Sequence, residues 1–115
     1  MIVSKKVSFD AAHHLPLIQG PCHRLHGHHW VAEIGVDGEV KDDGMVVDFA
    51  ILKHWMNQNI VEVFDHTLIN DVMINPTAEN IAGFIADNFK KTFTLKLAFV
   101  RVWETENSCV EWRSE

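Results

Sequence analysis

The spacing of apolar side chains changes twice along this chain, and no other feature of the sequence restricts its fold as strongly. Near both ends, apolar residues recur at every second position, which is the period of a half-buried strand. In the middle they recur at helical spacing. The segments with the strand period are residues 2–15, 28–37, 95–104 and 109–113. The helices are expected to begin after Asp48 and Thr77, whose side chains can cap a first turn.

The order strand, strand, helix, helix, strand, strand (ββααββ) predicts an α+β fold, with two helices on one face of a four-stranded antiparallel sheet. The chain has 115 residues and no internal repeat, so we expect a single domain, residues 1–115. The third predicted strand is apolar on both sides, with Leu97, Phe99 and Trp103 on one and Ala98, Val100 and Val102 on the other. Because two helices cover only one face, the other face and the sheet edges would be exposed. We therefore expect a homo-oligomer.

The composition, with 47% hydrophobic and 23% charged residues, is that of a soluble globular protein. The formal charge of −6 argues against a general nucleic-acid binder, because such proteins collect Lys and Arg against the phosphates. No apolar run is long enough to span a membrane, and the first residues lack the features of a signal peptide. We therefore expect a cytoplasmic protein with no membrane partner. With only Cys22 and Cys109, a disulfide framework is implausible.

The stretch from Cys22 to Trp30 reads CHRLHGHHW and holds four of the eight histidines. His26 and His28 are two residues apart in an extended segment, so both side chains project to one side. His13 lies on the apolar side of the first strand, and strand pairing would bring its ring to the same place. Three imidazoles with an open fourth position are a ligand set of catalytic Zn²⁺. Cys22 could instead join them in a closed structural site, and the spacing alone does not decide between the two.

Further polar residues fall in three short motifs: FDHTLIN contains Asp65 and His66, NPTAEN contains Thr77 and Glu79, and VWET contains Glu104. Taken alone, Asp65 and His66 could form an ordinary polar turn, and Glu79 could complement the dipole of its helix. Glu104 ends a strand on an apolar side, where a carboxylate needs a partner. Any single histidine of the first cluster could likewise be a surface or core residue, but the three together favour a metal site.

Six segments occur in the order found in one enzyme family and span almost the whole chain. They are FDAAHHLP at 9–16, CHRLHGH at 22–28, GMVVDFAILK at 44–53, FDHTLIND at 64–71, NPTAEN at 75–80 and WET at 103–105. With them the chain resembles the 6-pyruvoyl-tetrahydropterin synthase family. It is most similar to the bacterial branch, the 6-carboxy-tetrahydropterin synthases of queuosine (7-deazaguanine) biosynthesis.

The resemblance implies a T-fold (tunnelling fold), in which three subunits close their sheets into a barrel and two trimers stack as a homohexamer. The implied zinc ligands are His13, His26 and His28; the implied catalytic residues are Cys22 and the proton-relay pair Asp65 and His66; and the implied pterin-binding residues are Glu104, Thr77 and Glu79. Active sites of the family lie between subunits, so neighbouring chains are expected to contribute some of these groups.

The implied substrate is 7,8-dihydroneopterin triphosphate, and the implied products are 6-carboxy-5,6,7,8-tetrahydropterin, acetaldehyde and triphosphate. Triphosphate elimination by a 6-pyruvoyl-tetrahydropterin synthase would use the same ligands, although the compact CHRLHGH segment and the short chain favour the carboxy-forming type. A non-catalytic, zinc-dependent pterin-binding module on the same fold is a further alternative, but it would not need Cys22 and His66 together. Arg24 and His14 are candidates for phosphate contacts.

Overall fold

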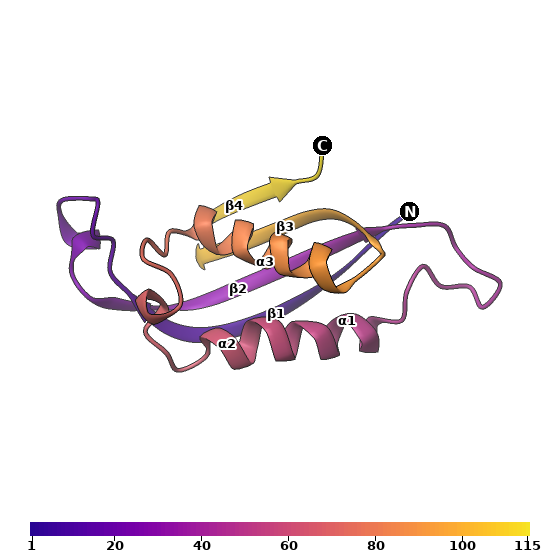
Figure 1. Cartoon of the computed structure of the whole chain (residues 1–115), viewed down its shortest axis with the longest axis horizontal. Coiled ribbons are helices and arrows are strands. Elements are labelled where there is room, and N and C mark those ends of the chain that lie inside the picture. The colour runs from indigo at the N-terminus through magenta and orange to yellow at the C-terminus, as the bar shows by residue number, and fades with distance from the viewer.

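The sheet contains four antiparallel strands in the order β1-β2-β3-β4, each paired with its neighbour in the sequence. The computed structural model describes all 115 residues. Its strands are β1 (Ile2–His13), β2 (His26–Asp37), β3 (Lys96–Thr105) and β4 (Ser108–Arg113). The two long strands β1 and β2 form a curved pair along much of the molecule (Figure 1). The predicted α+β class and the order ββααββ are confirmed.

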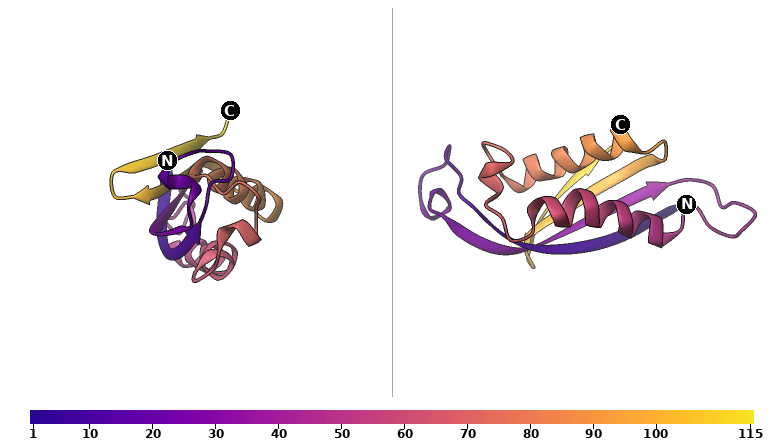
Figure 2. Two further views of the ribbon diagram at one scale, coloured as in Figure 1. Left: turned by 90° about the vertical axis from the view of Figure 1, so that its left-hand side faces the viewer. Right: turned by 60° about the horizontal axis from the view of Figure 1, so that its bottom comes forward.

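Two helical stretches connect β2 to β3 and lie side by side on one face of the sheet (Figure 2, right). The first consists of α1 (Phe49–Met56), a π-helical segment (Asn57–Val61) and α2 (Glu62–Phe64), and the second is α3 (Ala78–Thr92). The Asp48 side chain accepts a hydrogen bond from the Ala50 N–H, and Thr77 accepts one from the Asn80 N–H. Both predicted helix caps are therefore confirmed, whereas the spacing gave no sign of the π-helical segment. No helix is long and apolar enough to cross a membrane.

The hydrophobic core lies between the sheet and these helices. The strands contribute one side each, including Phe9, Trp30 and Val100, all of which are buried. The apolar spacing predicts that Phe49 belongs to the buried stripe of the first helix, but this residue is 54% exposed. Phe49 is the first residue of α1, and the buried stripe begins one turn later, at Leu52.

No helix covers the opposite face of the sheet, on which Phe99 and Trp103 of β3 lie beneath charged side chains. The alternation predicts Leu97 on the same side, but Leu97 is buried in the core because the pairing of β2 with β3 shifts between Gly35 and Val36. Arg101 donates a hydrogen bond to Glu33 at 3.0 Å, and its guanidinium carbon lies 4.0 Å from the centre of the Phe99 ring. Lys6 lies over the Trp103 ring in the same way, with its Nζ 4.8 Å from the ring centre. Cationic side chains of the same chain therefore cover part of this apolar surface, whose exposure was the reason to expect a homo-oligomer. The oligomer stays a prediction.

The strand boundaries differ from the prediction at the end that carries the histidines. β1 ends at His13 and not at residue 15, and β2 already begins at His26, so that these two residues form the last pair of the two strands. Residues 14–25 form a loop beyond this pair. The loop is closed by a hydrogen bond of 3.0 Å from the Leu15 N–H to the Cys22 carbonyl.

The outer edge of β1, which faces away from β2, is paired with the chain that follows the first helical stretch. The His66 N–H donates to the Asp10 carbonyl at 2.7 Å, and the Ala12 N–H donates to the Thr67 carbonyl at 3.0 Å. The sequence predicted only a loop over residues 64–76. Pairing with β1 holds this loop against the strand that ends in a predicted metal ligand.

Candidate metal centre

Three imidazoles meet on the helix-covered side of the sheet, at the end of the β1–β2 ladder. His13 pairs with His26 across the two strands, and Ala11 pairs with His28. Because side chains alternate along a strand, all three rings project to the same side. Their ring centroids are 4.6 Å (His13 to His26), 5.3 Å (His13 to His28) and 4.8 Å (His26 to His28) apart. The structure thus brings together all three residues that the sequence suggested as zinc ligands.

Hydrogen bonds fix the tautomer of two of these rings. His13 Nδ1 lies 2.8 Å from the Pro76 carbonyl oxygen, and His26 Nδ1 lies 2.6 Å from the Arg24 carbonyl oxygen. Because a carbonyl oxygen can only accept, both Nδ1 atoms carry a proton, and each neutral ring has a lone pair on Nε2. The two Nε2 atoms face each other at 3.0 Å. Two lone pairs this close repel each other unless a proton or a metal ion lies between them.

Burial favours a metal ion over a proton. His13 is fully buried and lies edge-on to the Trp30 ring, with ring centroids 4.9 Å apart. Loss of solvent lowers the pKa of His13 below its ordinary value of 6.5; the hydrogen bond to Pro76 opposes this shift, and the nearby His26 adds to it. Burial lowers the pKa of His28 as well. The rings of His13 and His28 are therefore neutral at pH 7, which leaves their lone pairs available to a metal ion.

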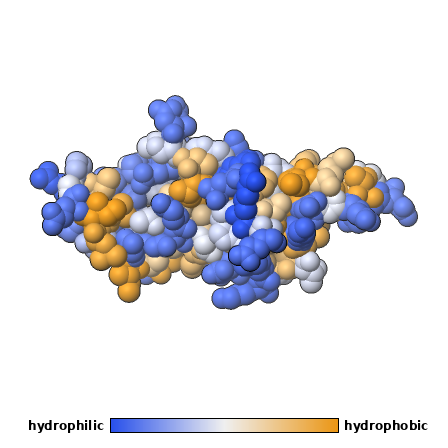
Figure 3. Space-filling model, turned by 90° about the horizontal axis from the view of Figure 1, so that it is seen from above, coloured by the Kyte–Doolittle hydropathy of each residue, from blue (hydrophilic) through white to orange (hydrophobic).

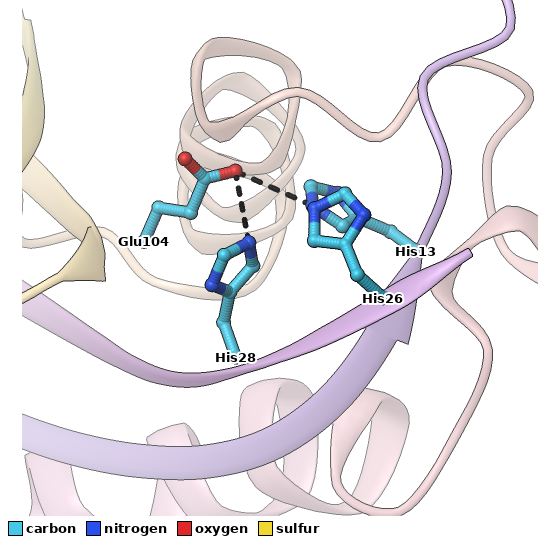
Figure 4. Close-up of side chains that lie close together, drawn as sticks. All are labelled: His13, His26, His28 and Glu104. Atoms are coloured by element: carbon cyan, nitrogen blue, oxygen red, sulfur yellow. Dashed lines mark hydrogen bonds and ion pairs between the residues drawn. The ribbon is translucent and has the colours of Figure 1, made fainter. Parts of the chain in front are cut away.

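The fourth group of the cluster is Glu104, near the end of β3 (Figure 4). Its Oε1 lies 3.3 Å from His13 Nε2 and 3.6 Å from His28 Nε2. Two ligands of a tetrahedral Zn²⁺ with bonds of about 2.0 to 2.1 Å are about 3.3 Å apart. The separations of 3.0, 3.3 and 3.6 Å between the ligand atoms therefore fit a single ion. His28 Nε2 is buried without a hydrogen-bond partner, and such an ion would supply one.

Cys22 is not part of this cluster. It is the middle residue of a 3-10 turn, Pro21–His23, and is exposed. The loop around it lines an open hollow of about 910 Å³ that reaches His26. Leu17, Ile18 and Leu25 are exposed apolar side chains of this loop. Figure 3 shows a hydrophobic patch at its left-hand end, the end of the molecule that carries the loop. Within one chain, the carboxylate of Glu104 and not the thiol of Cys22 lies beside the imidazoles.

Asp65 and His66 form a second polar cluster at the outer edge of β1, together with Asp10. Asp65 Oδ1 accepts a hydrogen bond of 2.9 Å from the Asp10 N–H, and Asp65 Oδ2 lies 3.8 Å from His66 Nε2. The Asp10 carboxylate in turn lies 2.7 Å from His29 Nδ1. His66 is the only residue other than glycine with a positive φ, 57°, and such strain is typical of functional positions. The predicted relay pair is thus in a different cluster from the imidazoles of its own chain, and Cys22 belongs to neither.

The motif NPTAEN reaches the imidazoles through a residue that the sequence did not single out. The buried Pro76 supplies the carbonyl that orients His13. Thr77 caps α3, and the exposed Glu79 lies in the first turn of that helix, so neither is in the imidazole cluster. Arg24 also contributes its carbonyl and not its side chain. The NPTAEN motif was the only sequence feature that indicated this part of the chain. The roles of Pro76 and Arg24 could not be predicted, because every residue has a backbone carbonyl.

Asn70 holds the chain just beyond His13. Its Oδ1 accepts a hydrogen bond of 3.0 Å from the His14 N–H, and its Nδ2 donates one of 2.9 Å to the His14 carbonyl. These two bonds continue the pairing of the 65–70 segment with β1. They connect the segment with the relay pair to the strand with the first imidazole.

Known proteins resemble the chain in sequence and in fold. The sequence profile of the family described as 6-pyruvoyl tetrahydropterin synthase matches residues 2–115. An Archaeoglobus fulgidus protein, provisionally named a 6-carboxy-5,6,7,8-tetrahydropterin synthase, is 40% identical over 113 residues, which are 98% of this chain and 96% of the relative. The 6-carboxy-5,6,7,8-tetrahydropterin synthase of Haemophilus influenzae is 31% identical, over 96% of this chain and 97% of its own.

Two further matches extend the comparison. The dihydroneopterin monophosphate aldolase of Pyrococcus furiosus is 38% identical over 108 residues, which cover 92% of this chain and 91% of that protein. Among solved structures, the 6-pyruvoyl tetrahydropterin synthase of Caenorhabditis elegans superimposes with a TM-score of 0.88 and 25% identity, over 100% of this chain and 96% of that one. The T-fold expected from the sequence is therefore confirmed for the single chain.

Proposed function

The chain belongs to the 6-pyruvoyl tetrahydropterin synthase family, and from this premise we propose that it is a zinc-dependent 6-carboxy-5,6,7,8-tetrahydropterin synthase. Membership of the family makes the chain a lyase of pterin biosynthesis. The proposed substrates are 7,8-dihydroneopterin triphosphate and one water, which supplies the second oxygen of the carboxylate, and acetaldehyde and triphosphate are the other products. The product would enter queuosine biosynthesis.

The observation that carries the zinc dependence is the pair of Nε2 lone pairs of His13 and His26, which face each other at 3.0 Å. Their protons are held on Nδ1 by backbone carbonyls, so this arrangement is stable only around a cation. With His28, these residues would hold Zn²⁺ through three neutral imidazoles. When bound, zinc would act as a Lewis acid toward the oxygens of the substrate side chain and lower the pKa of a hydroxyl group.

The protein groups proposed to move protons are Cys22, Asp65 and His66. Asp65 is held by the Asp10 N–H and keeps one carboxylate oxygen 3.8 Å from His66 Nε2, where it can orient the ring. His66 is 80% exposed, so its ring is free to reach a substrate bound by another copy of the chain. We propose that the relay pair of one subunit works with the Cys22 and the imidazoles of its neighbour. The separation of the two clusters within one chain supports this.

Glu104 is the proposed anchor of the pterin ring, because a carboxylate can accept two parallel hydrogen bonds from the amino and ring N–H groups of the pterin. Its side chain is 29% exposed and so is accessible to a ligand. Thr77 and Glu79 are proposed to lie near the pocket once subunits associate. A homohexamer, built as a dimer of trimers in the cytoplasm, is the assembly we propose, and sedimentation would test it.

A second candidate reaction is favoured by the 38% identity to the dihydroneopterin monophosphate aldolase. An aldolase would cleave the side chain between its two hydroxyl-bearing carbons and leave a hydroxymethyl group on the pterin. A 6-pyruvoyl-tetrahydropterin synthase would instead eliminate triphosphate and keep all three side-chain carbons. Zinc-loaded protein should therefore be incubated separately with the triphosphate and the monophosphate of 7,8-dihydroneopterin, and the products identified by mass spectrometry.

The proposed synthase gives the 6-carboxy product and acetaldehyde from the triphosphate. A 6-hydroxymethyl product from the monophosphate would identify the aldolase instead. A pterin with an intact three-carbon side chain and no phosphate would identify the 6-pyruvoyl reaction. Pterin binding without turnover of either substrate would favour a non-catalytic pterin-binding module.

A further inference from the structure

The orientation of Glu104 is not the one expected of a residue whose only role is to bind a pterin ring. One oxygen, Oε1, is turned into the imidazole cluster and lies 3.3 Å from His13 Nε2 and 3.6 Å from His28 Nε2 (Figure 4). The side chain is 29% exposed, so the carboxylate is partly shielded from water while one edge stays open to a ligand. A pterin anchor would need both oxygens directed at the N–H donors of the ligand.

The contact between Glu104 and His13 is also unfavourable without a cation. The Pro76 carbonyl keeps the proton of His13 on Nδ1, so a lone pair of Nε2 faces the carboxylate oxygen. Two acceptors at 3.3 Å do not form a hydrogen bond, and a negative charge beside a lone pair is repelled. A metal ion held by both groups would remove this repulsion, because each lone pair would be donated to the ion.

The geometry points to Glu104 as the fourth ligand of the metal ion in the ligand-free protein, a position that it gives up when a pterin binds. This inference rests on the proposed zinc site. The separations from Oε1 to the two nitrogens are close to the edge of a zinc tetrahedron, which is about 3.3 Å. The same carboxylate cannot hold the ion and accept two hydrogen bonds from the planar edge of a pterin at once. Binding of the pterin would therefore open one coordination position for the substrate side chain.

Glu104→Gln tests the resting state, because an uncharged carboxamide oxygen is a much weaker zinc ligand than a carboxylate. Glu106→Gln is the matched control, since this glutamate lies two residues further along, is exposed and is outside the cluster. Zinc affinity is measured on the full-length apoprotein by competition with a chromophoric chelator. We expect Glu104→Gln to weaken zinc binding by about tenfold or more. In other metal sites, loss of a group that only hydrogen-bonds to a metal ligand already lowers the affinity by about this factor. Glu106→Gln should bind zinc like the unmodified protein.

The exchange itself is followed in protein loaded with Co²⁺, whose visible absorption reports the ligands around the ion. The probe is neopterin, which carries the pterin ring and the side-chain hydroxyls but no phosphate. We expect neopterin to change the spectrum of the unmodified protein, and we expect Glu104→Gln to have an altered spectrum before any ligand is added. Circular dichroism of the apoproteins checks that each variant is folded.

The inference is overturned if Glu104→Gln binds zinc as tightly as the control and has the same cobalt spectrum as the unmodified protein. It is also overturned if the chain binds no zinc. Neither readout depends on turnover, so a failure of the proposed reaction would be seen separately, as absence of product from protein with the expected metal affinities and spectra.

Discussion

Replacing Asn70 with alanine tests whether its side chain holds the 65–70 segment to the end of β1. The substitution removes the two hydrogen bonds to His14, of 3.0 and 2.9 Å. Each such bond contributes about 1 kcal/mol net, so Asn70→Ala should lower the free energy of unfolding by about 2 kcal/mol. With an unfolding entropy of about 2.1 cal/mol/K per residue, that loss corresponds to a fall in Tm of roughly 8 °C for a chain of 115 residues. Urea denaturation of the zinc-free protein measures the change.

Hydrogen exchange shows where Asn70→Ala acts. We expect faster exchange of the His66 and Ala12 amides, which join the segment to β1, and little change in the middle of α3. Asn107→Ala is the control, because Asn107 is exposed in the β3–β4 turn and its side chain makes no hydrogen bond. A loss below about 0.5 kcal/mol, equal to that of an ordinary surface substitution, would refute the reasoning.

Three further predictions concern stability. The zinc-free protein should become less stable as the pH falls below 6.5. Burial lowers the pKa of His13 and His28 in the folded chain, so below this pH the unfolded chain binds more protons than the folded one. Urea midpoints that do not change across pH 6.5 would contradict this. Hydrogen bonds from Arg101, and then from Arg113, lower the pKa of Glu111 in the folded chain. The stabilisation from Glu111 is therefore complete above its ordinary pKa of 4.5 and is lost as the pH falls through the lowered value. The difference in unfolding free energy between the unmodified protein and Glu111→Gln should shrink below pH 4.5, and a constant difference would contradict this. Thr77→Ala should cost about 1 kcal/mol through loss of the α3 cap, whereas Thr77→Ser should cost much less, and equal urea midpoints for both variants would exclude this role.

The element order could be predicted because each element has its own apolar period and the helices begin at recognisable caps. Asp48 and Thr77 both accept the expected hydrogen bonds. The predicted strand ends were less accurate. The alternation continues past His13 to Leu15, but the pairing of β1 with β2 stops at His13. Pairing depends on the partner strand, which a local pattern does not contain.

At the candidate site, the imidazoles could be predicted because a strand period of two is enough to place His26 and His28 on one side. The residues that orient the imidazoles could not. Pro76 and Arg24 act through backbone carbonyls, which every residue carries, so residue type gives no signal. The orientation of Glu104 also depends on how β3 meets β2, which is a tertiary property.

X-ray absorption spectroscopy at the zinc edge tests the central claim most directly, because it reports the atoms bound to the metal in the full-length protein. The account predicts about one zinc per chain, with nitrogen and oxygen neighbours at about 2.0 to 2.2 Å, imidazole scattering from His13, His26 and His28, and no sulfur. A sulfur neighbour at about 2.3 Å would place Cys22 on the metal and contradict the account. Protein that retains no zinc would contradict it as well.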